Sequence, residues 1–316
     1  MKISGFTMVR NATKLYYPIR EAIESILPVC DEFVVALGNC DPDDRTEEEI
    51  ARIRSDKVRV IRTVWDLERF PRGSVHAQQT DVAMQACTGD WLFYVQSDEV
   101  VHERYLPGIR RRCEELLDDR EVEGLLFRYK HFWGDYRHYV LSHAMYPNEV
   151  RIVRRDPEIH SWWTAQGFRR IPDFDGVSYK ARKGTRKLKV ARVDAEIFHY
   201  GFVRPPRLMQ RKNKAFRTIH AGAAVAEAQF RDRPEVFDYG NLGRLAEYRD
   251  PPPAVMMERI ARMDWGDQLR FEEAPGRETR HRHERFKYRA LTFVEQRLLG
   301  GRTLFGYQNY VLLGDR

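Results

Sequence analysis

The sequence predicts an α/β fold in which a mostly parallel sheet is flanked by helices, with a helical C-terminal extension. Two observations predict it. Continuous apolar runs alternate with helix-like periodicities over the first hundred residues, and the connections between these segments are short. Strands joined through helices in this way are parallel neighbours. The chain has 316 residues, 42% of them hydrophobic, which is enough to bury a substantial core.

Four strands and three helices are expected in alternation at the start of the chain, at residues 2–9, 16–27, 31–38, 41–55, 57–64, 75–87 and 90–96. The segment 41–55 is expected to be a polar turn followed by a short helix. The first helix carries apolar residues at a period of 3.6, and Pro18 suits its first turn. Thr46 precedes three glutamates and is expected to be the N-cap of the second helix.

The later segments are expected to extend this sheet and then to change to helices. A helix is predicted over residues 105–119, and three further strands over 122–134, 149–156 and 195–203. Helices dominate after a boundary near Arg204, with an interruption at the prolines of "RDPPPA". The last segment, 281–313, is expected to be a helix followed by a less regular stretch.

Composition restricts the class of protein. No run of about 18 apolar residues is present, and the N-terminus does not resemble a signal peptide, so a cytoplasmic protein is expected. The four cysteines show no CxxC spacing, which argues against zinc and for reduced thiols. The net charge of +7 suits anionic partners: nucleotide diphosphates, nucleic acid or an anionic membrane. No GxGxxG follows the first strand, and there is no GxxxxGK[ST] motif.

Polar residues follow three of the predicted strands: "VRNA" at 9–12, "GNCDPDD" at 38–44 and "QSDE" at 96–99. In parallel α/β sheets, ligands bind at the carboxyl ends of the strands, so these segments should meet at one edge. The adjacent acids Asp98 and Glu99 end an apolar run. This position is costly for two carboxylates unless they face water or a cation.

The order of these segments resembles the donor half of GT-A glycosyltransferases of the family 2 type. In that family a strand ends in a polar turn, and a helix ending in "GD" leads into a strand ending in a DxD-type motif. Here "TGDWLFYVQSDE" matches the spacing of the second feature. The resemblance implies a catalytic domain over 1–203, with donor half 1–103 and acceptor half 104–203, and a helical region over 204–316.

Two positions depart from the pattern of the family. Gln96 stands where the first acid of DxD is usual, and Leu37-Gly38-Asn39 replaces the usual acid after the second strand. The resemblance implies a divalent cation, Mn²⁺ or Mg²⁺, on Asp98 and His199, which would help a diphosphate leave. Gln96 is either a weak cation ligand or a contact to ribose or phosphate.

The resemblance implies a nucleotide-diphosphate sugar as donor. The residues expected to contact it are Val9, Arg10, Asn11, Gly38, Asn39, Asp44, Gln79, Gln96, Ser97 and Arg204. The expected catalytic residues are Asp98 and Glu149, the latter as general base of an inverting transfer to a glycan or lipid-linked acceptor. A retaining transfer, which needs no such base, stays open.

Two further patterns bear on partners. Aromatic residues in "KHFWGDYRHY" and "HSWW" suit either an acceptor platform or core packing. The stretch "RHRHERFKYRALTFVEQRLLGG" combines basic and aromatic residues, as in helices that lie on anionic membranes at the inner face. Packing on the catalytic domain, which this pattern slightly favours, and a dimer interface also explain it.

The sequence therefore predicts a cytoplasmic, metal-assisted glycosyltransferase of cell-surface polysaccharide biosynthesis, without a nucleic-acid partner. Two alternatives stay open. One is a nucleotidyltransferase that makes nucleotide sugars, although the glycine-rich signature usual after its first strand is missing. The other is a non-catalytic basic protein that binds nucleic acid or glycan, for which affinity should fall steeply with salt.

Overall fold

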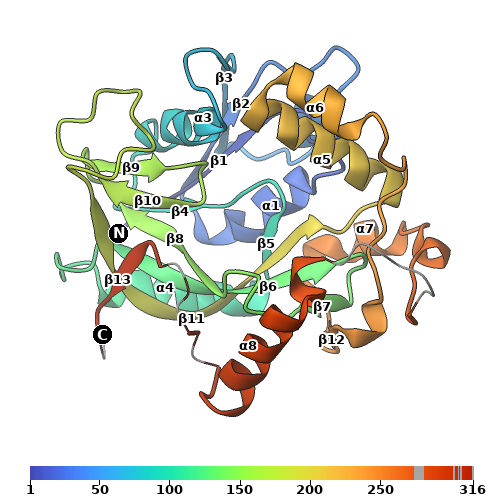
Figure 1. Cartoon of the computed structure of the whole chain (residues 1–316). Helices are drawn as coiled ribbons and strands as arrows, with labels where there is room; N and C mark the ends of the chain where they lie inside the picture. Colours follow the sequence, from blue (N-terminus) through green and yellow to red (C-terminus); the bar gives the residue numbers. More distant parts are fainter. Residues whose placement is uncertain (274–280, 302, 305, 307, 315–316) are drawn as a thin grey trace.

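The computed structural model describes residues 1–273, 281–301, 303–304, 306 and 308–314. Figure 1 shows one curled sheet with helices packed around it, and α8 projecting from its lower edge. In the described residues the sheet has 13 strands, with the main path β3-β2-β1-β4-β8-β6-β11-β10-β9. The strands of this sheet are β1 Ile3–Val9, β2 Glu32–Leu37, β3 Val58–Arg62, β4 Trp91–Tyr94, β5 Glu99–Val101, β6 Gly124–Trp133, β7 His138–Val140, β8 Asn148–Arg154, β9 Ile159–Trp162, β10 Gly167–Arg170, β11 Arg186–Phe202, β12 Ala246–Glu247 and β13 Tyr310–Leu312.

The first four strands on this path are parallel, and β8 then runs antiparallel to both β4 and β6. The helices are α1 Ile19–Ile26, α2 Thr46–Ala51, α3 Ser74–Gln85, α4 Leu106–Glu115, α5 Pro206–Ala221, α6 Ala223–Phe230, α7 Met257–Ala261 and α8 Phe286–Arg297. The predicted α/β class is confirmed: a sheet that begins with four parallel strands is flanked by helices. The later strands are more mixed in direction than a mostly parallel sheet suggests.

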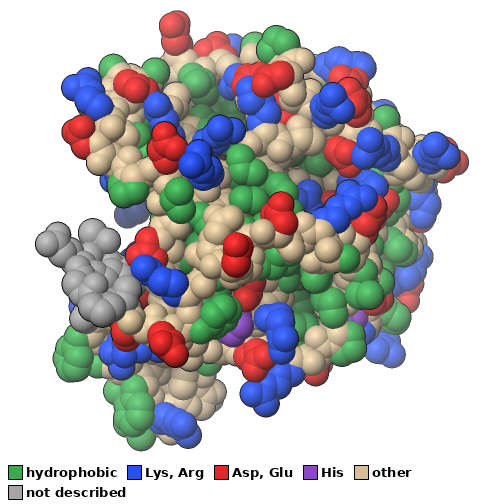
Figure 2. Space-filling view, turned by 90° about the vertical axis from the view of Figure 1, so that its right-hand side faces the viewer, with side chains coloured by type: hydrophobic (Ala, Val, Ile, Leu, Met, Phe, Trp, Pro, Cys, Tyr) green, Lys and Arg blue, Asp and Glu red, His purple; other side chains and the backbone are tan. Residues whose placement is uncertain are grey.

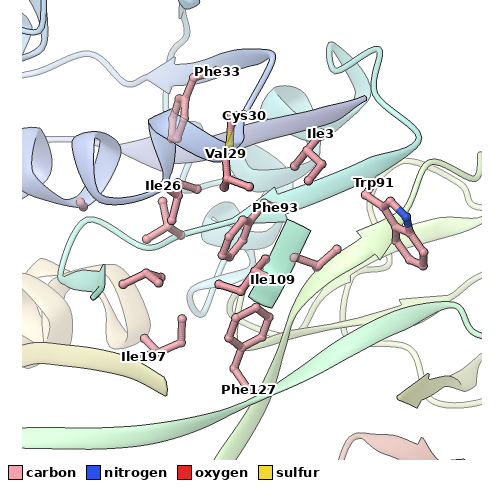
Figure 3. Packing of buried hydrophobic residues seen from close by; sticks show 14 of the residues in the cluster. Ile3, Ile26, Val29, Cys30, Phe33, Trp91, Phe93, Ile109, Phe127 and Ile197 are labelled. Carbon is pink, nitrogen blue, oxygen red and sulfur yellow. The ribbon is translucent and has the colours of Figure 1, made fainter. Parts of the chain in front are cut away.

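Alternation along the strands separates two hydrophobic layers. Phe33, Val35 and Leu37 of β2 face one side with α1 and α4, whereas Val34 and Ala36 face the other side with α3. Successive side chains of a strand point to opposite faces, so a strand covered on both faces is apolar throughout. Figure 3 shows the first layer, in which Phe93 and Phe127 stack beneath α1.

The expected helices and strands of the first hundred residues are present within a few residues of their predicted bounds. The N-cap expectation is corrected: Arg45 precedes α2, and the Thr46 hydroxyl instead accepts a hydrogen bond from the backbone of Ala12. Six short strands were not predicted, namely β5, β7, β9, β10, β12 and β13. Each is two to four residues long, too short to show a period in the sequence.

The region after Arg204 contributes to the same core as the residues that precede it. Tyr239, Met256 and Trp265 pack in one cluster with Phe132 and Tyr200. Strands β12 and β13 join the sheet through β7 and β11. The change from strand to helix expected at this boundary is present, but side chains from its two sides are packed together. Arg280, the first residue of the basic and aromatic stretch 280–301, lies outside the described residues.

Candidate active site

Two adjoining cavities open at the carboxyl ends of β1, β2 and β4. The first, the Asp98 cavity, has a volume of about 340 Å³, and the second, the Trp65 cavity, about 420 Å³. They share six lining residues: Met8, Tyr17, His76, Ser97, Lys212 and Phe216. The segments after three distant strands therefore meet at one edge, as predicted, and helix α5 covers them from the other side.

The two acids that end β4 have opposite environments. Asp98 lines the first cavity. Glu99 is 0% exposed and binds the Arg151 guanidinium through both oxygens, each at 2.8 Å. The hydroxyl of Tyr129 also donates to Glu99. Asp98 lies in the turn between β4 and β5, whereas Glu99 is the first residue of β5, so one carboxylate is presented to the cavity and the other is buried in an ion pair.

Asp98 and His199 face each other across a small gap. The Oδ2 atom of Asp98 lies 3.7 Å from Nε2 of His199. The gap exists because residue 201 is glycine: a Cβ there would lie 2.5 Å from Nε2 of His199 and 2.8 Å from Oδ2 of Asp98. A register shift between β6 and β11 falls at His199–Phe202, the kind of bulge that redirects side chains beside active sites.

Charge around Asp98 favours its ionised form. Burial alone would raise its pKa, but the His199 imidazole, Lys212 and Arg204 lower the pKa of Asp98 to about 2. The Lys212 ammonium lies on α5 at the junction of the two cavities. Burial and the neighbouring Arg204 charge lower the pKa of Lys212 to about 8. Its Nζ makes no hydrogen bond or ion pair with any residue that the structure describes, so it is available to an anion.

The Trp65 cavity is lined by the polar segments after β1 and β2. Val9, Arg10 and Asn11 lie on one wall, with Asp41 beside them. The Asn11 side chain accepts a hydrogen bond from the backbone of Asp41, which fixes the two loops against each other. The Arg10 guanidinium lies 5.8 Å from the Trp65 ring. The aromatic and hydrogen-bonding groups needed to hold a nucleoside are present here.

Several residues expected to contact the donor instead support these loops. Asp44 accepts hydrogen bonds from Thr13, Lys14 and Thr46. Burial alone would raise the pKa of Asp44, but these hydrogen bonds hold it below the usual range. The Asn39 side chain accepts the backbone N–H of Trp65. Gly38 lies under the Trp65 ring, where a Cβ would come within 2.4 Å of Nε1. These three residues therefore hold the loops around the Trp65 cavity in place, but they do not line the cavity.

Two other expected contacts, Gln79 and Arg204, also lie outside the cavity linings. Gln79 is buried and bonds to Thr63 and the Val64 carbonyl. Arg204 is 0% exposed, and its guanidinium donates to the backbone carbonyls of Leu15 and Gly201. In each case the side chain bonds to neighbouring elements of the fold, which sequence spacing does not reveal.

The expected general base, Glu149, does not line the Asp98 cavity either. It is buried on β8, where it accepts a hydrogen bond from Gln166 at 3.1 Å. Burial raises the pKa of Glu149 to about 7. Asp98 is the carboxylate that lines this cavity in the described part of the chain.

Gln96 lines the Asp98 cavity as expected, but its amide group is already engaged on one side. Nε2 donates to the Ala165 carbonyl at 2.9 Å, and its backbone N–H donates to Glu99. One of the two N–H bonds of the NH₂ group is therefore used within the fold. The amide ties the strand end to the loop before β10, where Ala165 has the left-handed φ of 60°.

The donor set at the gap suits a divalent cation. An ionised carboxylate and an imidazole are both acceptable ligands, and two ligands about 2.1 Å from one ion lie roughly 3 to 4 Å apart. The separation of 3.7 Å between Asp98 and His199 fits that range. Among described residues there is no group of three acidic, histidine or cysteine side chains that could hold a metal alone. The remaining ligands would come from phosphate oxygens and water.

Comparisons with known proteins find similarity in solved structures only. No protein-family model matches the chain. No curated protein matches it. A mycobacterial protein has 19% identity over 41% of each chain, with a TM-score of 0.29. The structure of S. aureus TarS 1–349 has 15% identity, covers 72% of this chain and 68% of its own, and has a TM-score of 0.38.

A third similar structure is glucosyl-3-phosphoglycerate synthase from Mycobacterium tuberculosis in complex with Mn²⁺, uridine diphosphate and phosphoglyceric acid. Its identity is 21%, over 42% of this chain and 43% of that one, with a TM-score of 0.27. The chain thus spans about two fifths of the length of two of these three proteins. Because all three TM-scores are below 0.5, the site is assigned from the residues of this chain and not from these structures.

Sequence reasoning did not find Lys212, Trp65, His76 or His131. Trp65 follows the third strand, so the rule that ligands bind at carboxyl ends could have identified it. Lys212 lies in an ordinary basic helix, and only the packing of α5 over the sheet edge brings it to Asp98. His131 of β6 lies opposite His199 of the parallel strand β11, and the two imidazoles are in hydrogen-bond contact.

Proposed function

We propose that this protein is a glycosyltransferase that moves a sugar from a nucleotide-diphosphate donor to a hydroxyl acceptor. The observation that carries the proposal is the arrangement of Asp98, His199 and Lys212 where a nucleoside-sized cavity meets a second cavity. A nucleoside in the Trp65 cavity would place its diphosphate at this junction. The second cavity would then receive the sugar and the acceptor.

The charges at the junction suit a departing diphosphate. Asp98 and His199 would hold a divalent cation, which supplies Lewis-acid neutralisation of the phosphate oxygens when bound. Lys212 would bind the same group from α5, and Ser97 lines both cavities beside it. Groups placed in advance where charge develops are the most effective form of electrostatic catalysis. Tyr146 and Phe202 on the Asp98 cavity offer apolar faces to a sugar ring.

The test is release of nucleoside diphosphate from a panel of UDP-, GDP- and dTDP-sugars, with and without Mn²⁺, for the wild type and Asp98→Asn. We expect slow metal-dependent release from one nucleotide class, lost in the variant. Release of pyrophosphate from a nucleoside triphosphate and a sugar phosphate would instead identify a nucleotidyltransferase. The absence of both reactions would favour a binding protein.

We also propose that α8 contacts an anionic membrane that carries a lipid-linked acceptor. Phe286 and Phe293 are seven residues apart on one face of α8 and are 83% and 61% exposed. Arg285, Lys287 and Arg289 are exposed beside them. Apolar side chains bordered by positive charge suit anionic lipid. In the described residues, no helix is both long and apolar enough to cross a bilayer.

Vesicle co-sedimentation tests this surface. We expect binding to vesicles with about a third anionic lipid and little binding to neutral vesicles. The double variant Phe286→Ser/Phe293→Ser should lose binding while retaining release of nucleoside diphosphate. Equal binding to both vesicle types, or a concentration-dependent dimer that the variant abolishes, would contradict the membrane assignment.

A further inference from the structure

His131 and His199 are linked by a hydrogen bond between like atoms. Nδ1 of His131 lies 3.0 Å from Nδ1 of His199. Nε2 of His131 lies 2.7 Å from the carbonyl oxygen of Tyr146. His131 is almost fully buried, and no carboxylate of the described residues bonds to it. The chain of contacts therefore runs from a backbone carbonyl through two imidazoles to Asp98.

The carbonyl fixes where the hydrogens of this chain lie. A carbonyl oxygen only accepts, so Nε2 of His131 carries a hydrogen. A neutral imidazole has one N–H, so Nδ1 of His131 then has a lone pair and accepts. Nδ1 of His199 must be the donor in the contact between the two rings. In neutral His199 this leaves Nε2 with a lone pair, directed toward Asp98 at 3.7 Å.

We infer that His131 is a positioning residue that holds His199 in the tautomer able to bind a cation. The inference rests on the proposed function, because the cation belongs to it. A lone pair on Nε2 facing an ionised carboxylate is unfavourable unless a proton or a metal cation lies between them, and a bound cation takes the place of the proton. Partners that orient a ligating histidine through its other nitrogen are a general feature of metal sites. Here that partner would be a second histidine.

The ring of His131 also packs between aromatic residues, but packing does not explain its polar contacts. Tyr129 stacks on it with ring centroids 5.4 Å apart, and Tyr146 meets it edge-on at 4.5 Å. A phenylalanine would preserve both ring contacts and lose the acceptor for His199. An asparagine would lose the ring and keep an acceptor near the position of Nδ1. These two substitutions therefore separate packing from hydrogen bonding.

The first measurement is the tautomer of His199 by long-range ¹H–¹⁵N correlation on ¹⁵N-histidine-labelled full-length protein without metal. Its signals are assigned with His199→Asn. We expect the Nδ1–H form in the wild type and a shift toward Nε2–H in His131→Phe. An Nε2–H signal for His199 in the wild type would overturn the inference, whether or not the variant folds.

The second measurement is Mn²⁺ affinity, followed by electron paramagnetic resonance with saturating nucleoside diphosphate. We expect His131→Phe to weaken Mn²⁺ binding about 10- to 100-fold. His131→Asn should stay within about threefold of the wild type. Equal losses in the two variants would overturn the inference. If the tautomer is as expected but no form of the protein binds Mn²⁺, His131 still orients His199 and the proposed function fails.

Discussion

At the scale of single residues, the site depends on which of two neighbours is buried. Asp98 and Glu99 are equivalent in the sequence, yet one lines a cavity and the other is enclosed with Arg151. The chain turns at Asp98 and enters β5 at Glu99. Arg151 of β8 then supplies the charge that pairs with Glu99 in the core.

The Lys212 ammonium gives a prediction about diphosphate recognition. Lys212→Met should weaken binding of the preferred nucleoside diphosphate about 10- to 100-fold, because a charge-assisted hydrogen bond is lost. Binding of the parent nucleoside, which has no phosphate, should not change. Isothermal titration calorimetry measures both. The matched control is Lys214→Met on the same helix, whose partner is the surface residue Glu227. Equal losses for nucleoside and diphosphate would contradict this role.

Glu149 gives a prediction about pH. Burial raises its pKa to about 7, so the folded state holds a proton that the unfolded chain releases near pH 4.5. The stabilisation that this bound proton gives the folded state is present at low pH and is lost as pH rises through about 7. The difference is worth about 3 kcal/mol. Glu149→Gln keeps a neutral side chain at every pH, so its free energy of unfolding should not fall over this pH range.

The free energy of unfolding in urea, measured from pH 5 to pH 8, checks this. We expect Glu149→Gln to gain stability relative to the wild type as pH rises, with turnover within about threefold, because Glu149 does not line the cavity. A parallel pH dependence of both proteins, or a loss of turnover of a hundredfold or more, would return Glu149 to the role of general base.

At the scale of secondary-structure elements, the bulge in β11 brings its backbone beneath Asp98 and His199. Gly201→Ala should displace both side chains, since a Cβ there would overlap them. We expect Mn²⁺ affinity in the presence of nucleoside diphosphate to fall at least tenfold. Gly108→Ala in α4 is the control, where no atom lies within 4 Å and alanine should stabilise the helix. Unchanged Mn²⁺ affinity in Gly201→Ala would contradict the placement of the cation.

The junction of β5 and β8 depends on the buried ion pair between Glu99 and Arg151. Arg151→Met leaves a buried carboxylate without its partner, so it should destabilise the protein by about 3–5 kcal/mol. The double variant Glu99→Gln/Arg151→Met should recover much of this loss. Urea denaturation of the wild type and the three variants measures the coupling. A single-variant cost below about 1 kcal/mol would show that the pair contributes little.

At the scale of the whole molecule, the sequence predicted the α/β class and the meeting of three strand ends at one edge. Both follow from local periodicity and from the geometry of parallel sheets. It did not predict that α5 brings Lys212 over that edge, or that Arg204 and Gln79 are buried supports. These depend on how distant segments pack, which has no local signature. Short strands such as β5 and β9 were not predicted because they are too short to show a period in the sequence.

Positive and negative side chains are interspersed over the face shown in Figure 2, around an apolar centre. The net charge of +7 is a small excess over many paired charges. The favourable sites for an anion are therefore local, and the Lys212 junction is the one that combines burial with an unpaired ammonium among the described residues.

The measurement that tests the central claim most directly is the coupling between Mn²⁺ and nucleoside diphosphate in a thermal-shift panel of UDP, GDP, CMP and dTDP. A ligand that binds the folded state alone raises the melting temperature in proportion to its affinity. The account predicts stabilisation by one nucleoside diphosphate that grows with Mn²⁺ in the wild type. In Asp98→Ala the dependence on Mn²⁺ should disappear. No stabilisation by any nucleotide, or the same Mn²⁺ dependence in Asp98→Ala, would contradict the account.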